Sequence, residues 1–184
     1  MKQKLRKTVG VVGGIALVLM LASAFLPQPA MADPDEITLV PNGDIITDWT
    51  SSGASHYTEV DEGIAGQDGD STSIYTSANF TIDKFDLTST SGIGKCTAAT
   101  VKVYCKTTGA TTLGVNLRKS DGGSIGSGSA SVPSSYASVE YAFTGLDLSQ
   151  ADVNGMTIEV TPYFTSSEMR ITAIEVVITY SAAT

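Results

Sequence analysis

Beyond the first 36 residues, apolar and polar residues alternate along much of the chain, which is the pattern of half-buried β-strands. Val, Ile, Thr and Tyr are enriched in these segments, and no stretch of a dozen residues keeps a 3.6-residue apolar repeat. We therefore expect strands and few or no helices. The expected strands are residues 37–40, 45–49, 57–60, 73–77, 80–87, 98–106, 112–118, 138–144, 156–164 and 170–180.

Turn-forming residues separate these strands at short intervals. Residues 41–44, 66–70 and 121–124 combine glycine with Asn or Asp, which tolerate the backbone angles of tight turns. Residues 121–135 are so rich in glycine and serine that we expect a long exposed loop there. Many short strands between frequent turns are typical of sandwiches and barrels. The pattern predicts an all-β fold, an antiparallel two-sheet β-sandwich of the jelly-roll type, in residues 42–184.

The first 32 residues have the layout of a secretory signal peptide. Four basic residues lie within residues 2–7, and residues 9–26 form an uncharged apolar run. Ala30 and Ala32 supply the small side chains of a cleavage site, so we expect a cut before Asp33. The alternative is an uncleaved membrane anchor, since the apolar run approaches the length that spans a bilayer. The favoured interpretation is a secreted or cell-surface protein that has no membrane attachment after cleavage.

Removal of residues 1–32 makes the chain strongly acidic. That segment contains four of the eleven basic residues and none of the nineteen acidic ones, so the remainder carries a net charge of −12. Such a surface repels phosphate backbones and anionic lipids and favours cations. We therefore expect no nucleic-acid partner.

The chain has two cysteines, Cys96 and Cys105. An exported pair suggests a disulfide, yet nine residues of continuous strand would separate the two Cα atoms by about 30 Å. A bridge would require the chain to fold back between them. Cys105 shares its face with Val101 and Val103 and is expected in the core, whereas Cys96 is expected on the other face or in the turn.

The sequence offers no clear catalytic group. His56 is the only histidine and is expected to be a surface imidazole, and no serine lies in a Gly-x-Ser-x-Gly motif. Glu159 and Glu175 are the carboxylates we nominate for a glycosidase pair, although a solvated position explains Glu175 without a function. We therefore expect a protein that is not an enzyme, with a small hydrolase as the remaining catalytic alternative.

An acidic segment suggests a metal site. Asp61, Glu62, Asp68 and Asp70 place four carboxylates within ten residues, with glycines between them. Hard oxygen ligands on flexible loops suit Ca²⁺, although the spacing does not follow the EF-hand pattern. The sequence thus predicts these four residues as calcium ligands, with an exposed acidic turn as the alternative.

Several short motifs together resemble a known group of modules. They are Trp49, residues 60–62, residues 68–75, Phe85 and the strand at residues 174–180. The chain from about residue 38 to 180 resembles the jelly-roll modules of phage tail, virion and exported prokaryotic surface proteins, which are similar to carbohydrate-binding and concanavalin-like sandwiches. The resemblance implies the fold and a non-catalytic surface role. No glycan-site residue carries over, because aromatic platforms are scarce.

Two functions follow from these observations. The first is a secreted module that binds glycan or cell-surface material in adhesion, with Trp49 as a stacking platform or, alternatively, a core residue. The second is a structural subunit of an extracellular filament that binds copies of itself. In that case residues 33–41 form an arm whose Ile37 and Leu39 add to the sheet of a neighbouring copy, unless the arm pairs within its own domain.

Overall fold

Strands dominate the computed structural model, which describes residues 35–164 and 167–183. The elements are β1 (Asp35–Leu39), β2 (Pro41–Thr47), β3 (Thr50–Ser51), the 3₁₀-helix η1 (Tyr57–Glu59), α1 (Gly63–Gly66), β4 (Ile74–Thr76), β5 (Asp83–Leu87), β6 (Ile93–Thr107), β7 (Thr111–Arg118), β8 (Ser124–Ser131), β9 (Ala137–Leu148), α2 (Gln150–Asn154), β10 (Thr157–Phe164) and β11 (Met169–Ala182). No helix in this part of the chain is both long and apolar enough to cross a bilayer. The signal peptide expected at residues 1–32 lies outside the described residues.

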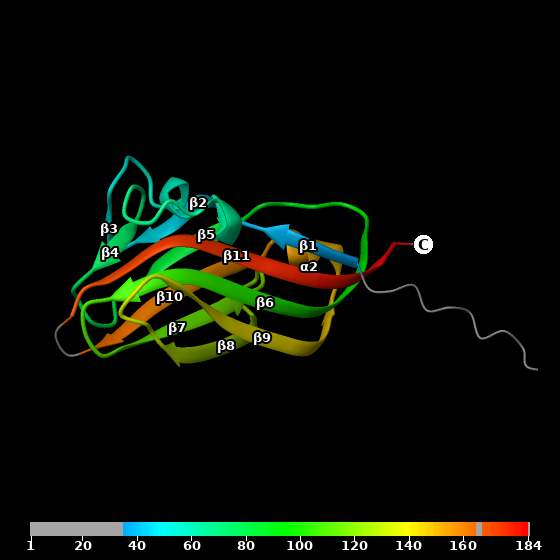
Figure 1. Ribbon diagram of the computed structural model, residues 1–184. Helices are drawn as coiled ribbons and strands as arrows, with labels where there is room; N and C mark the ends of the chain where they lie inside the picture. The colour runs from blue at the N-terminus through cyan, green and yellow to red at the C-terminus, as the bar shows by residue number, and fades with distance from the viewer. Residues whose placement is uncertain (1–34, 165–166, 184) are drawn as a thin grey trace, which may run out of the picture. The chain divides into compact units, whose positions relative to one another are not determined.

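The strands form two antiparallel sheets that pack face to face (Figure 1). Sheet A has the order β3-β4-β11-β6-β9, with β1 also paired to β11, and sheet B has the order β2-β5-β10-β7-β8. From β4 onward the chain places β4, β6, β9 and β11 in sheet A and β5, β7, β8 and β10 in sheet B. The orders β4-β11-β6-β9 and β5-β10-β7-β8 are those of a jelly roll. The predicted fold class is confirmed.

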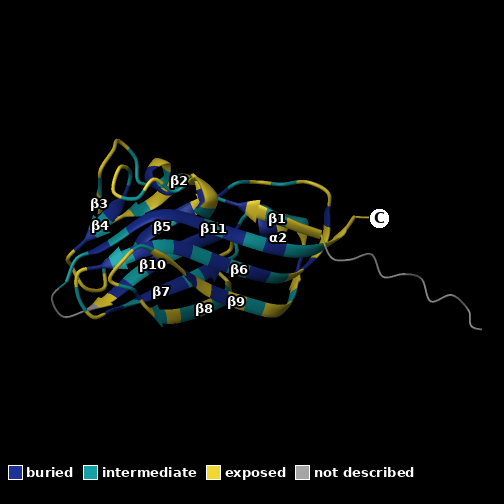
Figure 2. Ribbon diagram, viewed as in Figure 1, coloured by how far each residue is buried: buried dark blue, intermediate teal, exposed yellow. Residues whose placement is uncertain are grey.

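The core lies between the two sheets, and burial alternates along the central strands (Figure 2). Ile174, Val176 and Ile178 of β11 are fully buried, as the alternation predicts, and Phe85 and Ile158 face them from sheet B. Trp49 is 5% exposed and belongs to the same cluster, so it is a core residue and not a stacking platform.

A β-bulge places both cysteines in the core. The register of β6 shifts between Cys96 and Ala98, so Cys96 lies on the same buried face as the odd-numbered residues from Ala99 to Thr107. Cys96 and Cys105 are consequently both fully buried, and both are free thiols. The expectation that Cys96 lies on the other face or in the turn is wrong, because the sequence gives no sign of the bulge.

Both thiols should be inert in the folded protein. Burial raises the pKa of Cys105 to about 12 and also raises that of Cys96, so little reactive thiolate forms near neutral pH. We expect a thiol reagent such as Ellman's reagent to label neither cysteine in the native state and both after addition of denaturant. Rapid native labelling of one cysteine would contradict the buried positions.

Two expected elements differ in the structure. Residues 57–60 were expected as a strand, yet the backbone N–H groups of His56 and Tyr57 donate to the Asp44 carboxylate, and the chain turns into η1. The expected loop at 121–135 instead contains β8, which pairs with β7. Gly126 and Gly128 let the rings of Phe143 and Tyr141 lie against this strand. The glycines that suggested a loop therefore serve packing.

The N-terminal arm pairs within its own chain. In β1, Ile37 lies opposite Ile178 and Leu39 lies opposite Val176, and Leu39 is 1% exposed. Only Val40 separates β1 in sheet A from β2 in sheet B. Addition of Ile37 and Leu39 to a neighbouring copy stays a prediction.

Candidate functional site

His56 is hydrogen-bonded to a buried carboxylate and is not the surface imidazole that was expected. Its Nδ1 lies 2.6 Å from Oδ2 of Asp83, and the two side chains are 14% and 0% exposed. The other oxygen, Oδ1, accepts the backbone N–H of Trp49 at 2.9 Å. Burial is the main cause that raises the pKa of Asp83, against the hydrogen bonds that lower it. Both carboxylate oxygens of Asp83 therefore hold neighbouring groups of the fold in place.

The nominated glycosidase pair is wrong, because its two carboxylates lie on opposite sides of the sandwich. Glu159 faces outward from β10 of sheet B, where it pairs with Lys84 and Arg118. Glu175 faces outward from β11 of sheet A, where it pairs with Lys102. Two carboxylates separated by the whole core cannot flank one glycosidic bond.

The four predicted calcium ligands fall into two groups. Asp61, Glu62 and Asp68 lie near one another. Burial is the largest cause that raises the pKa of Glu62, and the negative charges of Asp68 and Asp61 raise it further. Asp70 points elsewhere, toward Lys106. Within residues 35–164 and 167–183, no group of three or more His, Cys, Asp or Glu side chains is placed to hold a metal ion. Calcium binding by these residues stays a prediction.

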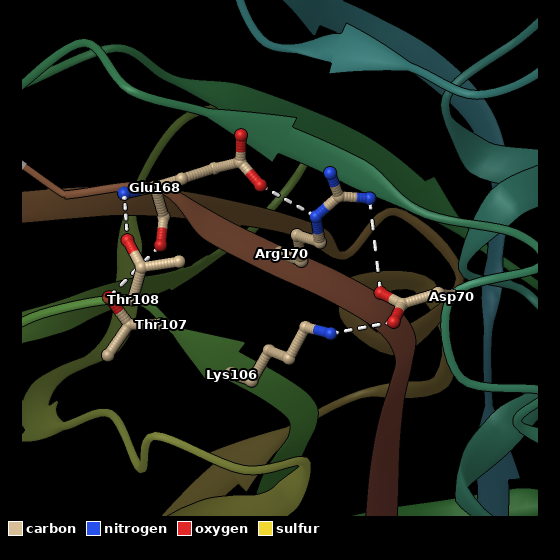
Figure 3. A pocket seen from close by; sticks show the side chains of 6 residues that line it. All are labelled: Asp70, Lys106, Thr107, Thr108, Glu168 and Arg170. Carbon is tan, nitrogen blue, oxygen red and sulfur yellow. Dashed lines mark hydrogen bonds and ion pairs between the residues drawn. The ribbon is translucent and has the colours of Figure 1, made fainter.

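Asp70 belongs to a charged pocket of about 460 Å³ on the outer side of sheet A (Figure 3). Its Oδ2 lies 2.7 Å from Nζ of Lys106, and Glu168 Oε1 accepts from Nε of Arg170 at 2.7 Å. The hydroxyl of Tyr136 donates to Oδ1 of Asp70 at 2.7 Å. The hydrogen bond from Lys106, followed by that from Tyr136, lowers the pKa of Asp70. The charges of this pocket satisfy one another and fasten the loop before β4 to sheet A.

Two exposed aromatic side chains lie at one end of sheet B. Phe80, in the β4–β5 connection, is 66% exposed, and Tyr163, near the end of β10, is 42% exposed. Their ring centroids are 5.5 Å apart in an edge-to-face arrangement. The backbone N–H of Phe80 donates to the carbonyl of Pro162 at 3.1 Å, which joins the two segments. We call Phe80 and Tyr163 the aromatic platform.

The platform borders a shallow groove on the outer face of sheet B. One hollow of about 380 Å³ is lined by Gly114, Val115, Asn116, Ser127, Gly128, Ser129 and Tyr163. A second, of about 290 Å³, is lined by Ala110, Thr111, Thr112, Ser131, Val132 and Tyr163. Because Tyr163 lines both, we call the two hollows together the Tyr163 groove. A side chain at Gly114 would meet the Tyr163 ring at 2.5 Å, so this glycine allows the ring to lie on the sheet.

Phe80 adopts a backbone conformation that costs energy. Its φ is +62°, and among the described residues it alone has a positive φ without being glycine. For a bulky side chain this conformation costs about 1–2 kcal/mol. The same residue exposes most of its ring to water. The strained backbone thus holds an apolar ring exposed to water.

Sequence reasoning missed the platform. Tyr163 lies on the opposite face of its strand from Ile158, Val160 and Pro162, so the alternation of the sequence predicts that its side chain points outward. Its contact with Phe80, 83 residues earlier in the chain, could not be predicted from the sequence.

Comparisons with known proteins give likenesses of fold. No protein-family model matches the chain, and no curated protein matches its sequence. Among solved structures, it is similar to the CBM35 of Abf62 from Cellvibrio japonicus, at 15% identity over 81% of this chain and 100% of that one, with a TM-score of 0.49. It is also similar to the C-terminal CBM6 of LamC from Zobellia galactanivorans, at 8% identity over 78% of this chain and 99% of that one, with a TM-score of 0.47. A family 35 carbohydrate binding module from Clostridium thermocellum matches at 10% identity over 77% and 97% of the two chains, with a TM-score of 0.47.

Proposed function

We propose that the chain is a secreted, non-catalytic glycan-binding module whose ligand lies in the Tyr163 groove. The observation that carries this proposal is Phe80, which is held exposed on a strained backbone beside Tyr163. Folding alone gives no reason to expose this ring, since an apolar ring is more stable when buried. A ligand with an apolar face would supply that reason.

The groove has the chemistry to bind sugar rings. The C–H face of a sugar packs on an aromatic ring, and its hydroxyls form hydrogen bonds with amide and hydroxyl groups such as those of Asn116, Ser127 and Ser129. None of the residues that line the two hollows is charged. The rest of the chain is acidic, which disfavours anionic ligands. These features favour a neutral glycan, at a cell surface if the predicted signal peptide exports the protein.

Replacement of Tyr163 by alanine should weaken glycan binding about 10- to 100-fold, the range for a central aromatic contact. Affinity electrophoresis against a panel of neutral polysaccharides measures this effect. Tyr104→Ala is the matched control, because Tyr104 lies on β6 of the other sheet and stacks on Tyr136. Equal losses in both variants, or a wild-type protein that binds no glycan, would contradict the proposal.

Phe80→Gly should separate binding from stability. Glycine relieves the positive φ, so we expect the free energy of unfolding to rise by up to about 1 kcal/mol while glycan affinity falls. Phe80→Ala is the control, because it removes the ring and keeps the strain. Both variants should bind weakly, and only the glycine variant should be more stable in urea denaturation. Unchanged affinity in both would remove Phe80 from the site.

A further inference from the structure

The edge strand β8 presents unpaired backbone groups on one side. Among the described strands it pairs with β7 alone. The N–H of Val132 donates to the carbonyl of Thr111, and backbone bonding alternates along antiparallel strands. By this alternation, Ser127, Ser129 and Ser131 direct their N–H and carbonyl groups away from β7. These residues form a free hydrogen-bonding edge.

From residue 126 to residue 131, this edge has none of the usual protection against pairing. Proteins commonly guard exposed edge strands with charged residues, proline or bulges. β8 contains neither a charged residue nor proline, and its register shifts only at its start, between Leu117 and Arg118 on the partner strand. Among the other edge strands, β9 carries Glu140 and Asp147, β1 carries Asp35 and Glu36, β2 contains Pro41 and Asp44, and β3 has only two residues. β8 is therefore the edge that another strand can approach most readily.

The distribution of charge permits a second copy of this chain as the partner at β8. Residues 33–184 carry a net charge of −12, so two copies repel each other over most of their surface. Residues 122–139 contain no charged side chain, and this is the longest uncharged run in residues 33–184. Two copies can therefore approach along β8 without bringing like charges together.

We propose that two copies of this chain associate through β8, paired antiparallel about a twofold axis. Their two five-stranded B sheets then form one ten-stranded sheet. A symmetric pair uses the same edge of each copy and closes the assembly at two copies. Because Ser127 and Ser129 also line the Tyr163 groove, pairing places the two grooves on one continuous face. On the proposed function, a long glycan would then engage both grooves and gain avidity.

Sedimentation velocity of residues 33–184 tests the pairing without any glycan. This part of the chain contains the whole core, so it is expected to fold alone. The wild-type mass should double as concentration rises. Ser129→Pro removes an outward N–H and should halve that mass, whereas Ser129→Ala keeps the N–H and should still pair. A monomer at every concentration, a dimer of the proline variant, or masses that rise beyond two copies would overturn the proposal.

A second experiment tests pairing through β8 with variants that contain no proline, because the proline variant could lose association by misfolding. Ser127→Lys and Ser127→Glu place like charges near the twofold axis, so each protein alone should be monomeric. An equal mixture should regain the doubled mass through opposite charges. Failure of the mixture to associate, while both proteins keep wild-type circular dichroism, would overturn pairing through β8. Because these outcomes are masses, they are independent of whether the groove binds glycan.

Discussion

Replacement of Asp83 by alanine should lower the free energy of unfolding by about 3–5 kcal/mol, the range for breaking a buried hydrogen-bond network. Asp83 is 0% exposed, and its two oxygens hold the backbone N–H of Trp49 and the ring of His56. Alanine leaves both partners without an acceptor and opens a void beside them. Urea denaturation followed by Trp49 fluorescence measures the loss. A change below about 1 kcal/mol would contradict the structural role of Asp83.

Asp83→Asn is the matched variant and adds a pH dependence. Asparagine keeps an oxygen for the N–H of Trp49 and removes the ionisable group, so its loss should be smaller than that of alanine. Burial raises the pKa of Asp83 above its usual 3.8 in the folded protein. The stability that this group contributes is therefore complete below about pH 3.8 and decreases as pH rises through the folded pKa. The wild type should accordingly lose stability relative to Asp83→Asn as pH rises through that range, and the opposite slope would contradict the raised pKa.

Gly128→Val should destabilise the protein by about 3 kcal/mol through overpacking and loss of a hydrogen bond. A Cβ at Gly128 would lie 2.7 Å from Cδ1 of Tyr141. That ring cannot move easily, because it is buried and its hydroxyl donates to the carbonyl of Leu113 at 2.8 Å. Thermal denaturation measures the effect. Ser131→Val, at an exposed position of the same strand, is the control and should be nearly neutral; a similar loss there would attribute the effect to β-propensity and not to the ring.

The sequence predicts most of the fold, because burial and alternation coincide on the central strands. Ile174, Val176 and Ile178 alternate with more polar residues in the sequence, and all three are buried in the structure. The position of their strand is therefore predicted correctly. The prediction fails where tertiary contacts override composition. The composition of β8 predicts a loop, because its glycines and serines are typical of loops. The reason for two of these glycines is their packing against the rings of Phe143 and Tyr141, which lie far away in the sequence. Similarly, the bulge that buries Cys96 depends on pairing with β9 and β11, which no local pattern records.

The candidate site is harder to predict, because its parts come from distant segments. Asp70 was selected from the sequence as a carboxylate beside other acids, yet its partners Lys106 and Tyr136 lie 36 and 66 residues away. Their basic and phenolic groups hold Asp70 and fasten its loop to sheet A, a role that the acidic residues around it in the sequence do not indicate. Phe80 shows the complementary limit, since no local sequence pattern marks it for a positive φ.

The central position of β11 determines when this protein can fold. β11 pairs with β1 and β4 along one side and with β6 along the other, and the pairing of Glu36 with Thr179 joins segments more than 140 residues apart. Contacts of such long range make folding slow, because the chain must close a large loop before they form. Until residues 169–182 are present, β1, β4 and β6 have no common neighbour and sheet A cannot assemble. Because Ile174, Val176 and Ile178 of β11 also belong to the core, the growing chain cannot complete its core until residues 169–182 have been synthesised.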